Sequence, residues 1–481
     1  MSSEYDVIVI GAGAVGENVA DRTAQGGLRT VVVEAELVGG ECSYWACMPS
    51  KALLRSGALL RAAQHVGGTR EAVTGPLDVR AVLKRRDMVA HNWDDTSQVK
   101  WLESTGIDLV RGHAVITAPR EVTVTAEDGT VTVLTARHAV VVATGSANLL
   151  PDIPGLRESR PWTSRDATSA QQVPASLAIL GGGVVAVEMA TAYVGFGVDV
   201  HLIARSGLLK NNEPFAGELV EKSLRELGAK VHLDVSPTSV ERTDDGGVRL
   251  QLDDGSTVEA EELLVAAGRI PHTGDLGLET LGLTGGDWLT VDDSMRVLGA
   301  DGEPVDGGAL YGVGDVNHRA LLTHQGKYQA RAAGDAIAAR ARGTDVSLEP
   351  WGAFVATADH QAVPQVTFTD PEVASVGLTA AAADKAGYRF SVVDYAIENI
   401  AGATIDSDAY EGVARMVVDE DRRVVIGATF VGQDVAELLH SATVAIVGEV
   451  PIERLWHAVP SYPTLSEVWL RLLEGYGRPA E

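Results

Sequence analysis

The chain has 481 residues, 45% of them hydrophobic, and a formal net charge of −27. It is too long for one hydrophobic core, so we expect three or four domains. The 52 glycines are typical of an α/β protein rich in tight turns. The acidic charge argues against a nucleic-acid partner, because a phosphate backbone would be repelled.

The sequence shows no pattern typical of a membrane-spanning segment or of a secretory signal peptide. Residues 1–6 lack the basic region and apolar core of a signal peptide. No apolar run approaches the ~18–20 residues that cross a bilayer. We therefore expect a cytoplasmic protein, in which two lone cysteines favour redox chemistry or metal binding over a disulfide framework.

The first segment has the pattern of a dinucleotide-binding unit. Residues 6–10 are a short β-branched apolar run that predicts a buried strand. A glycine turn follows, with Gly11, Gly13 and Gly16. A helix to about residue 26 and a strand at 30–33 come next, ending at Glu34. The glycines admit a pyrophosphate to the helix N-terminus, and the acid accepts hydrogen bonds from ribose hydroxyls.

The only two cysteines, Cys42 and Cys47, follow this unit. In an ideal helix, residues five positions apart have Cα atoms roughly 8.6 Å apart, whereas a relaxed disulfide needs about 4.4–6.8 Å. A bridge would therefore bend the start of the helix and would be more easily reduced than a structural one. The alternative is two buried thiols that never meet, since free cysteine is often buried. The spacing alone does not decide between them.

Residues 52–110 predict helices, one beginning at Ala52 and one at 79–101. The basic cluster 84–86 on the second helix is expected on a solvated face. Three predicted strands come next, at 122–125, 131–134 and 139–142. An Asp128-Gly129 turn joins the first two as a hairpin. The third strand leads into Thr144 and Gly145.

The whole pattern then repeats. A strand at 177–180 enters a second glycine turn, with Gly181, Gly183 and Ala186. A helix with Glu188 and a strand at 198–203 follow, and a meander with an Asp254-Gly255 turn closes on 263–268. Two nucleotide-binding units in one chain predict two nucleotides between which electrons can pass.

The repeats differ at the position that would contact the ribose. Glu34 lies 23 residues after Gly11, and the same count from Gly181 reaches Ala204, with Arg205 next. The second repeat therefore lacks the acid at this position. The next residue instead carries a guanidinium, which can bind a 2′-phosphate. We therefore expect the second unit to take NADPH rather than NADH, with Lys210 as a second candidate phosphate contact. The alternative is that Arg205 is an ordinary surface charge.

The later segments carry further candidate sites. The segment 309–315 predicts a strand that ends on Asp315, which could hydrogen-bond a cofactor's polyol chain. Thr323 is expected to be the N-cap of the next helix, whose N-terminus would favour an anionic reduced flavin. Residues 350–481 lack a glycine fingerprint; strands near 414–418 and 423–429 and helices from 435 and 465 predict an α+β interface domain.

Together these landmarks resemble the class I flavin-dependent pyridine-nucleotide disulfide oxidoreductases, from about residue 5 to 470. The resemblance implies an α/β fold with two Rossmann-like nucleotide-binding domains, for FAD and NAD(P), and a C-terminal α+β dimerisation domain. The expected domains are 1–150 (FAD, first part), 151–275 (NAD(P)), 276–349 (FAD and central, second part) and 350–481 (dimerisation).

The resemblance also implies residue roles. Cys47 would lie against the flavin as the charge-transfer thiolate, and Cys42 would be the interchange thiol that attacks the substrate. Lys51 and Glu188 would pair beside the flavin nitrogen that receives hydride. The implied cofactor contacts are Gly11, Gly13, Gly16, Glu34, Lys51, Thr144, Gly145, Asp315, Thr323, Gly181, Gly183, Ala186, Arg205, Gly268 and Arg269.

The implied reaction is an electron transfer from NADPH to FAD, then to the Cys42–Cys47 disulfide, and on to a small disulfide or another two-electron acceptor. The implied assembly is a homodimer with shared active sites. No nucleic acid, membrane or metal site is expected.

The sequence departs from this family in two places. Tyr462 stands where thiol-substrate members have a histidine paired with the acid that is here Glu467. A phenol with a reference pKa near 10 is a poor base at neutral pH, and His457 is the alternative base. The aromatic filler 43–46 is similar to that of the transhydrogenase group, which lacks the second cysteine. The alternatives are therefore a mercuric-reductase-like or transhydrogenase/diaphorase-type enzyme, or a flavin-bearing thiol redox sensor.

Overall fold

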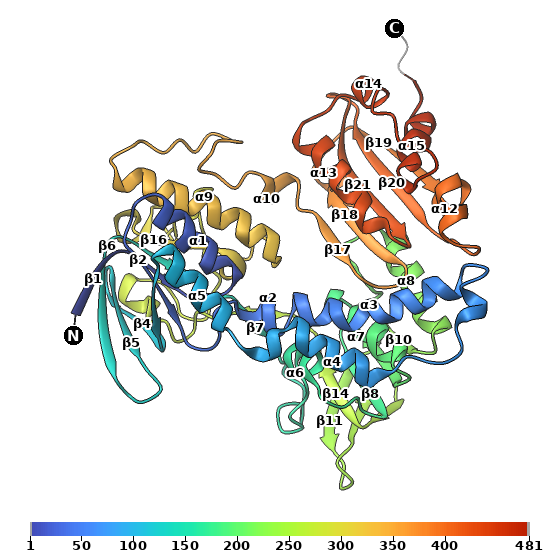
Figure 1. The fold of residues 1–481 in the computed structure, drawn as a ribbon, viewed down its shortest axis with the longest axis horizontal. Coiled ribbons are helices and arrows are strands. Elements are labelled where there is room, and N and C mark those ends of the chain that lie inside the picture. The colour runs from blue at the N-terminus through green and yellow to red at the C-terminus, as the bar shows by residue number, and fades with distance from the viewer. Residues whose placement is uncertain (1, 479–481) are drawn as a thin grey trace. The chain divides into compact units, whose positions relative to one another are not determined.

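The computed structural model describes residues 2–478 (Figure 1). The chain folds into two compact units, and each unit is assembled from separate segments. The first unit takes the chain up to Pro49, then Asp87–Asn148 and Arg269–Asp359. The second takes Ser50–Arg86, Leu149–Gly268 and the chain from His360 onward.

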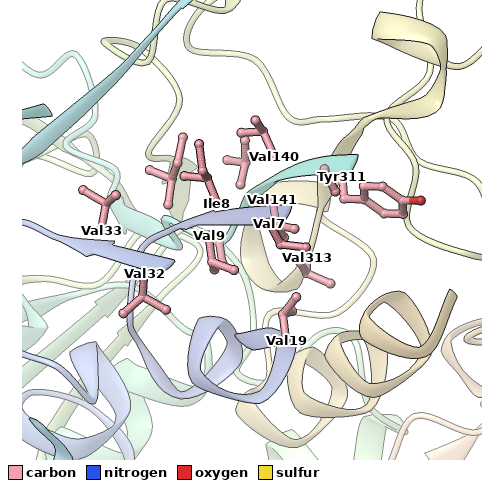
Figure 2. Close-up of a cluster of buried hydrophobic side chains, with 14 of the residues drawn as sticks. Val7, Ile8, Val9, Val19, Val32, Val33, Val140, Val141, Tyr311 and Val313 are labelled. Carbon is pink, nitrogen blue, oxygen red and sulfur yellow. The ribbon is translucent and has the colours of Figure 1, made fainter. Parts of the chain in front are cut away.

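A seven-stranded sheet forms the centre of the first unit, in the order β3-β2-β1-β6-β5-β4, with β16 paired to β6. Its strands are β1 (Ser2–Ile10), β2 (Thr30–Glu34), β3 (Asp108–Arg111), β4 (His113–Ala118), β5 (Glu121–Thr125), β6 (Val131–Val142) and β16 (Leu310–Gly312). The central strand β1 runs parallel to both β2 and β6. Figure 2 shows its residues Val7, Ile8 and Val9 in the core of this unit, where all three are fully buried. Parallel strands are covered on both faces, which is why their sequences are continuously apolar.

Strand β6 pairs with both β5 and β1. Its first half forms the expected hairpin with β5, and Gly129 in the turn has a left-handed φ of 82°. Its second half runs parallel to β1. The prediction of separate strands at 131–134 and 139–142 is therefore wrong, because both belong to one strand that leaves the hairpin and enters the parallel sheet.

Helices α1 (Ala14–Gln25) and α9 (Thr323–Ala341) pack side by side in the first unit. A Cβ added at Gly326 would lie 2.5 Å from Val15, and one added at Gly334 would lie 2.5 Å from Arg22. Since the contacts advance along both helices together, the helices run in the same direction. Their N-termini therefore lie at the same edge of the sheet.

The second unit repeats the architecture of the first. Its parallel sheet has the order β10-β9-β8-β14, next to an antiparallel sheet β11-β12-β13. The strands are β8 (Ser176–Leu180), β9 (Asp199–Ala204), β10 (Lys230–Leu233), β11 (Pro237–Arg242), β12 (Val248–Leu252), β13 (Thr257–Ala260) and β14 (Glu262–Val265). The helices beside them are α6 (Ser164–Ser169), α7 (Val184–Gly195) and α8 (Pro214–Glu226).

The C-terminal part of the second unit is a five-stranded antiparallel sheet with short helices, ordered β17-β18-β21-β20-β19. Its strands are β17 (Gln365–Thr367), β18 (Glu372–Gly377), β19 (Phe390–Ala396), β20 (Val413–Asp419) and β21 (Val424–Gly432). Its helices are α11 (Ala380–Lys385), α12 (Ala401–Asp406), α13 (Leu439–Val447), α14 (Ile452–Leu455) and α15 (Val468–Tyr476). This is the α+β domain that the sequence predicts.

The remaining α-helices and strands are α2 (Gly40–Tyr44), α3 (Cys47–Gln64), α4 (Val79–Val89), α5 (Thr96–Thr105), α10 (Ala358–Gln361), β7 (Ser146–Asn148) and β15 (Arg269–Pro271).

The helices predicted for residues 52–110 differ from the structure in three ways. Helix α3 starts at Cys47, before Ala52, and the predicted helix 79–101 is two helices. Arg86 is buried and donates to the carbonyl oxygens of Thr168 and Ala170, so the solvated-face prediction is wrong for it. Within residues 2–478, no helix has the length and apolar character of a bilayer span.

We predict that Gly16→Ala destabilises the first unit. A Cβ at Gly16 would lie 1.9 Å from the carbonyl oxygen of Gly11, so the glycine turn would have to move. The expected loss in the free energy of unfolding is about 1–3 kcal/mol, measured by urea denaturation. Gly75→Ala is the control, because a Cβ there meets nothing within 4 Å. Equal stability of the two variants would contradict the packing argument.

Candidate active site

The two cysteines lie on either side of a break in the helical chain. Cys42 belongs to α2, Cys47 is the first residue of α3, and residues 45 and 46 between them are not helical. Both residues are thiols in the structure, and the Cys42 thiol hydrogen-bonds with Cys47. The break therefore brings together two sulfurs that a continuous helix would separate. The alternative of thiols that never meet does not hold in this structure.

Thr323 is the third member of this cluster. The N-cap of α9 is Leu322, which makes no side-chain cap, so the prediction of Thr323 as N-cap is wrong. Instead, the Thr323 hydroxyl hydrogen-bonds with Cys47 Sγ, at 3.2 Å. The hydrogen bond with Cys47 and burial raise the pKa of the Cys42 thiol, while Thr323 and the charge of Lys327 act to lower it. The Cys42 thiol is therefore protonated at neutral pH.

The first glycine turn is open to an anionic ligand. Gly13 is the N-cap of α1 and has no side chain to cap the helix, so its first N–H groups are available. Glu34 Oε2 accepts from the N–H of Ala12 at 2.7 Å, which places the carboxylate beside the turn. Burial raises the pKa of Glu34. This site fits FAD, because it combines a glycine turn, a helix N-terminus without a side-chain cap and an acid after the second strand.

Asp315, the residue expected at the polyol chain, is connected by hydrogen bonds through Ser146 to Arg269, another candidate residue. Asp315 Oδ2 lies 2.5 Å from Ser146 Oγ, and Arg269 Nε donates to the same Ser146 oxygen at 2.6 Å. Thr144 Oγ1 donates to the carbonyl oxygen of His272 at 2.7 Å. Gly145 has a φ of 74° and open space around its Cβ position. Ser146 was not predicted from the sequence, although it directly follows the predicted Thr144 and Gly145.

Lys51 and Glu188 form an ion pair in the second unit. The distance from Lys51 Nζ to Glu188 Oε2 is 2.8 Å, and Glu188 is only 3% exposed. Glu188 Oε1 accepts from the N–H of Phe368 at 2.9 Å, and Lys51 Nζ lies 5.0 Å from the centre of the Phe368 ring. Phe368 is a further member of this site that the sequence analysis did not assign.

The second glycine turn leaves its positive residues accessible. Gly183 is the N-cap of α7 and, like Gly13, provides no side-chain cap. Arg205 directly follows β9, and both it and Lys210 are exposed. Ala204, at the position of the missing acid, is buried. Gly181, Ala186 and Gly268 complete this edge, and Gly181 has a left-handed φ of 144°.

The candidate residues near the C-terminus, Tyr462, Glu467 and His457, are distant in the sequence from the two cysteines. Their environments differ from one another. Tyr462 is 76% exposed, whereas Glu467 is 6% exposed. Glu467 Oε1 accepts from Arg471 at 2.6 Å, while Oε2 is buried and has no hydrogen-bond partner within residues 2–478. His457 is exposed. Arg471, which the sequence analysis missed, holds the glutamate in place.

Two family comparisons cover most of the chain. Residues 5–335 match the pyridine nucleotide-disulphide oxidoreductase family, and residues 363–472 match its dimerisation domain. A dihydrolipoyl dehydrogenase of Haloferax volcanii is 32% identical over 98% of this chain and 95% of its own length. A mercuric reductase of Staphylococcus aureus is 28% identical over 96% of this chain and 81% of its own.

Solved structures share the fold. LpdA from Mycobacterium tuberculosis superposes with a TM-score of 0.80 at 26% identity, over 97% of this chain and 99% of its own. The HOCl-induced flavoprotein disulfide reductase RclA from Escherichia coli, in its Cu(II) complex, gives a TM-score of 0.81 at 22% identity, over 98% and 99%. With its two Rossmann-like nucleotide-binding domains and its dimerisation domain, the chain belongs to the FAD-dependent pyridine nucleotide-disulfide oxidoreductases, a family of enzymes.

Proposed function

We propose that this enzyme passes electrons from NADPH through FAD to a Cys42–Cys47 disulfide, and from the dithiol to a small disulfide or another two-electron acceptor. The observation that carries the proposal is the contact between the two thiols at the break between α2 and α3. The chain has no other cysteine, so this pair is its only thiol redox centre.

The residues around FAD would bind and orient it. The N–H groups at the start of α1 would face the pyrophosphate, Glu34 the adenosine ribose, and Asp315 with Ser146 the ribityl chain. When bound, FAD supplies a two-electron carrier between a nicotinamide and a disulfide. Lys51, fixed by Glu188 at 2.8 Å, would place its ammonium beside the flavin ring.

The cysteines would carry out the sulfur chemistry. Two electrons and two protons convert the Cys42–Cys47 disulfide into two thiols. The Cys42 thiolate then attacks one sulfur of an outside disulfide, forming a mixed disulfide and releasing a thiolate. Attack of Cys47 on Cys42 reforms the internal bridge and releases the second thiolate. Each cycle thus consumes one outside disulfide and yields two thiols.

We propose NADPH as the electron donor because of the contrast between the two glycine turns. Glu34 follows β2 in the first, whereas buried Ala204 and exposed Arg205 follow β9 in the second. A carboxylate in that place would repel a 2′-phosphate, and a guanidinium binds one with two hydrogen bonds. Exposed Lys210 adds a second positive charge on the same loop.

We also propose a division of labour among the domains. Residues 1–150 and 276–349 would bind FAD, residues 151–275 NADPH, and residues 350–481 would hold two subunits together. The C-terminal domain of each subunit, with Tyr462 and Glu467, would complete the active site of the other. The 76% exposure of Tyr462 supports this, since a second subunit would cover that side chain.

A second candidate is reduction of a soft metal ion by the same dithiol. The similarity to a mercuric reductase favours it, and vicinal thiolates are good ligands for such ions. A transhydrogenase would make less use of a second cysteine in contact with the first. A redox sensor would use both cysteines but would show little turnover. Steady-state NADPH oxidation with disulfides, quinones and metal ions as acceptors distinguishes these candidates.

We predict that a redox-active Cys42–Cys47 disulfide lets the enzyme accept more electrons than FAD alone. We also predict that disulfide reduction, but not dye reduction, depends on Cys42. Anaerobic NADPH titration should take up more than two electrons per FAD and produce long-wavelength thiolate–flavin absorbance. Cys42→Ser should abolish disulfide reduction but leave dye reduction intact. Ser43→Ala, the neighbouring control, should retain both activities. Full disulfide reductase activity in Cys42→Ser would show that Cys42 is not the interchange thiol.

We predict that Arg205→Ala weakens NADPH selectively. Loss of a charged hydrogen bond to the 2′-phosphate, about 1.5–3 kcal/mol, should raise the KM for NADPH about 10- to 100-fold and spare NADH. Arg249→Ala is the control, since Arg249 is an exposed arginine that pairs with Glu241 and Glu259 on the antiparallel sheet. Unchanged preference for NADPH in Arg205→Ala would remove the cofactor argument.

A further inference from the structure

Lys327 lies on the face of α9 that meets the thiols. It follows Thr323 by four residues, so the two side chains share one face of the helix. Thr323 touches Cys47 from that face, at 3.2 Å. Helical side chains lean toward the N-terminus, which directs the Lys327 side chain back toward Thr323 and the dithiol. The pKa of the Cys42 thiol is raised by Cys47 and by burial, and the positive charge of Lys327 offsets part of that rise.

Glu17 is a half-buried acid that the proposed reaction does not use. It lies in the first turns of α1, the helix that packs against α9 beside Lys327, where Gly326 meets Val15. Its Oε1 is buried and has no hydrogen-bond partner within residues 2–478. Burial raises the pKa of Glu17 to about 7. The positive charge of Lys327 acts to lower this pKa, and the negative charge of Glu34 acts to raise it. A carboxyl group of this kind changes charge near neutral pH.

The groups that act on Glu17 and Cys42 belong to three elements of the first unit. The charge of Lys327 on α9 acts on both of them, and the charge of Glu34 on β2 acts on Glu17. Tyr44 of α2, the helix that carries Cys42, also feels the charge of Glu17, but its hydroxyl donates to the carbonyl oxygen of Val38. Lys327 is therefore the cation that the acid and the thiol share.

The dithiol needs such a cation. The thiolate, not the thiol, attacks a disulfide, and burial beside Cys47 holds the proton on Cys42. Tyr462 is a phenol, which is a poor base near neutral pH. We propose that Lys327 is a positioning residue that stabilises the Cys42 thiolate, and that Glu17 sets how much of the lysine's charge the thiol receives. This proposal rests on the proposed function in taking Cys42 as the attacking thiol.

The two states of Glu17 have different consequences for the thiol. When Glu17 is protonated, the positive charge of Lys327 is uncompensated and acts fully on Cys42. When Glu17 is ionised, it pairs electrostatically with Lys327 and the thiol receives less of that charge. The proton that leaves Cys42 goes to solvent, and the electron pair left on sulfur forms the new bond to the outside disulfide, whose second sulfur leaves as a thiolate.

The test measures how readily Cys42 ionises in the full-length, FAD-loaded enzyme. The protein is reduced with a phosphine, and the alkylation of Cys42 by iodoacetamide is followed by peptide mass spectrometry across the pH range. Lys327→Met should slow alkylation about tenfold at neutral pH and move the pH profile to higher pH. Lys327→Arg should restore the wild-type profile. Arg331→Met, an exposed cation one turn further along α9, should leave the profile unchanged.

Glu17→Gln provides a second, independent readout. Below the pKa of Glu17, about 7, the variant and the wild type should react at the same rate, because the wild-type acid is already neutral. Above it, Glu17→Gln should react several-fold faster, because the competing negative charge is gone. In a Lys327→Met background, Glu17→Gln should have little effect. Without the lysine, the pKa of Glu17 rises further and the acid stays neutral.

Several outcomes would overturn the proposal. An unchanged alkylation profile in Lys327→Met, or an equal shift in Arg331→Met, would remove the role of Lys327. Rates that are equal in Glu17→Gln and wild type at every pH would remove the role of Glu17. If Lys327→Met loses its flavin, the comparison of Glu17→Gln with wild type still decides, since it retains the lysine. Alkylation requires neither NADPH nor an acceptor, so failure of the proposed function would appear separately, in the NADPH titration.

Discussion

The break between α2 and α3 is the constraint on which the proposed chemistry depends. A continuous helix would hold Cys42 and Cys47 too far apart to react with each other. Two non-helical residues, 45 and 46, turn the chain so that the thiols meet. The start of α9 supports this arrangement from the other side, because Thr323 touches Cys47. That support requires the close approach of α9 to α1, which Gly326 permits.

The internal repeat is visible in individual hydrogen bonds as well as in the order of elements. The N–H of Gly11 donates to Val33 and the N–H of Gly181 donates to Ile203, at 2.8 and 2.9 Å. A Cβ on either glycine would collide with the carbonyl oxygen of the residue that closes the sheet, Ala143 or Ala266. Both turns therefore need glycine at the same place for the same reason. The repeats share this first glycine. They differ at the third position of the turn, Gly16 against Ala186, and after the second strand, where Glu34 is replaced by Ala204.

The sequence predicts the parts of this molecule that local pattern determines. Period, turn chemistry and glycine spacing locate both nucleotide-binding folds, and the pairing of Lys51 with Glu188 follows from the family resemblance. It fails where long-range packing decides. Arg86 reads as a surface charge, but its guanidinium is buried and donates to carbonyl oxygens more than eighty residues away. Thr323 reads as a helix cap, yet its hydroxyl binds sulfur, because the cap position is already taken by Leu322.

The same limit explains why Glu17 and Lys327 carry no signal in the sequence. Neither belongs to a sequence motif. Glu17 is an acid in the first turn of a helix, where acids are favoured, and Lys327 is a single lysine one turn into another helix. Only the parallel packing of α1 and α9 makes a single ammonium available to a half-buried carboxyl and to a thiol. The two titrations are then coupled, so the charge on one group depends on the charge of the other. In this way, a carboxyl that never touches the acceptor can influence how readily the sulfur reacts.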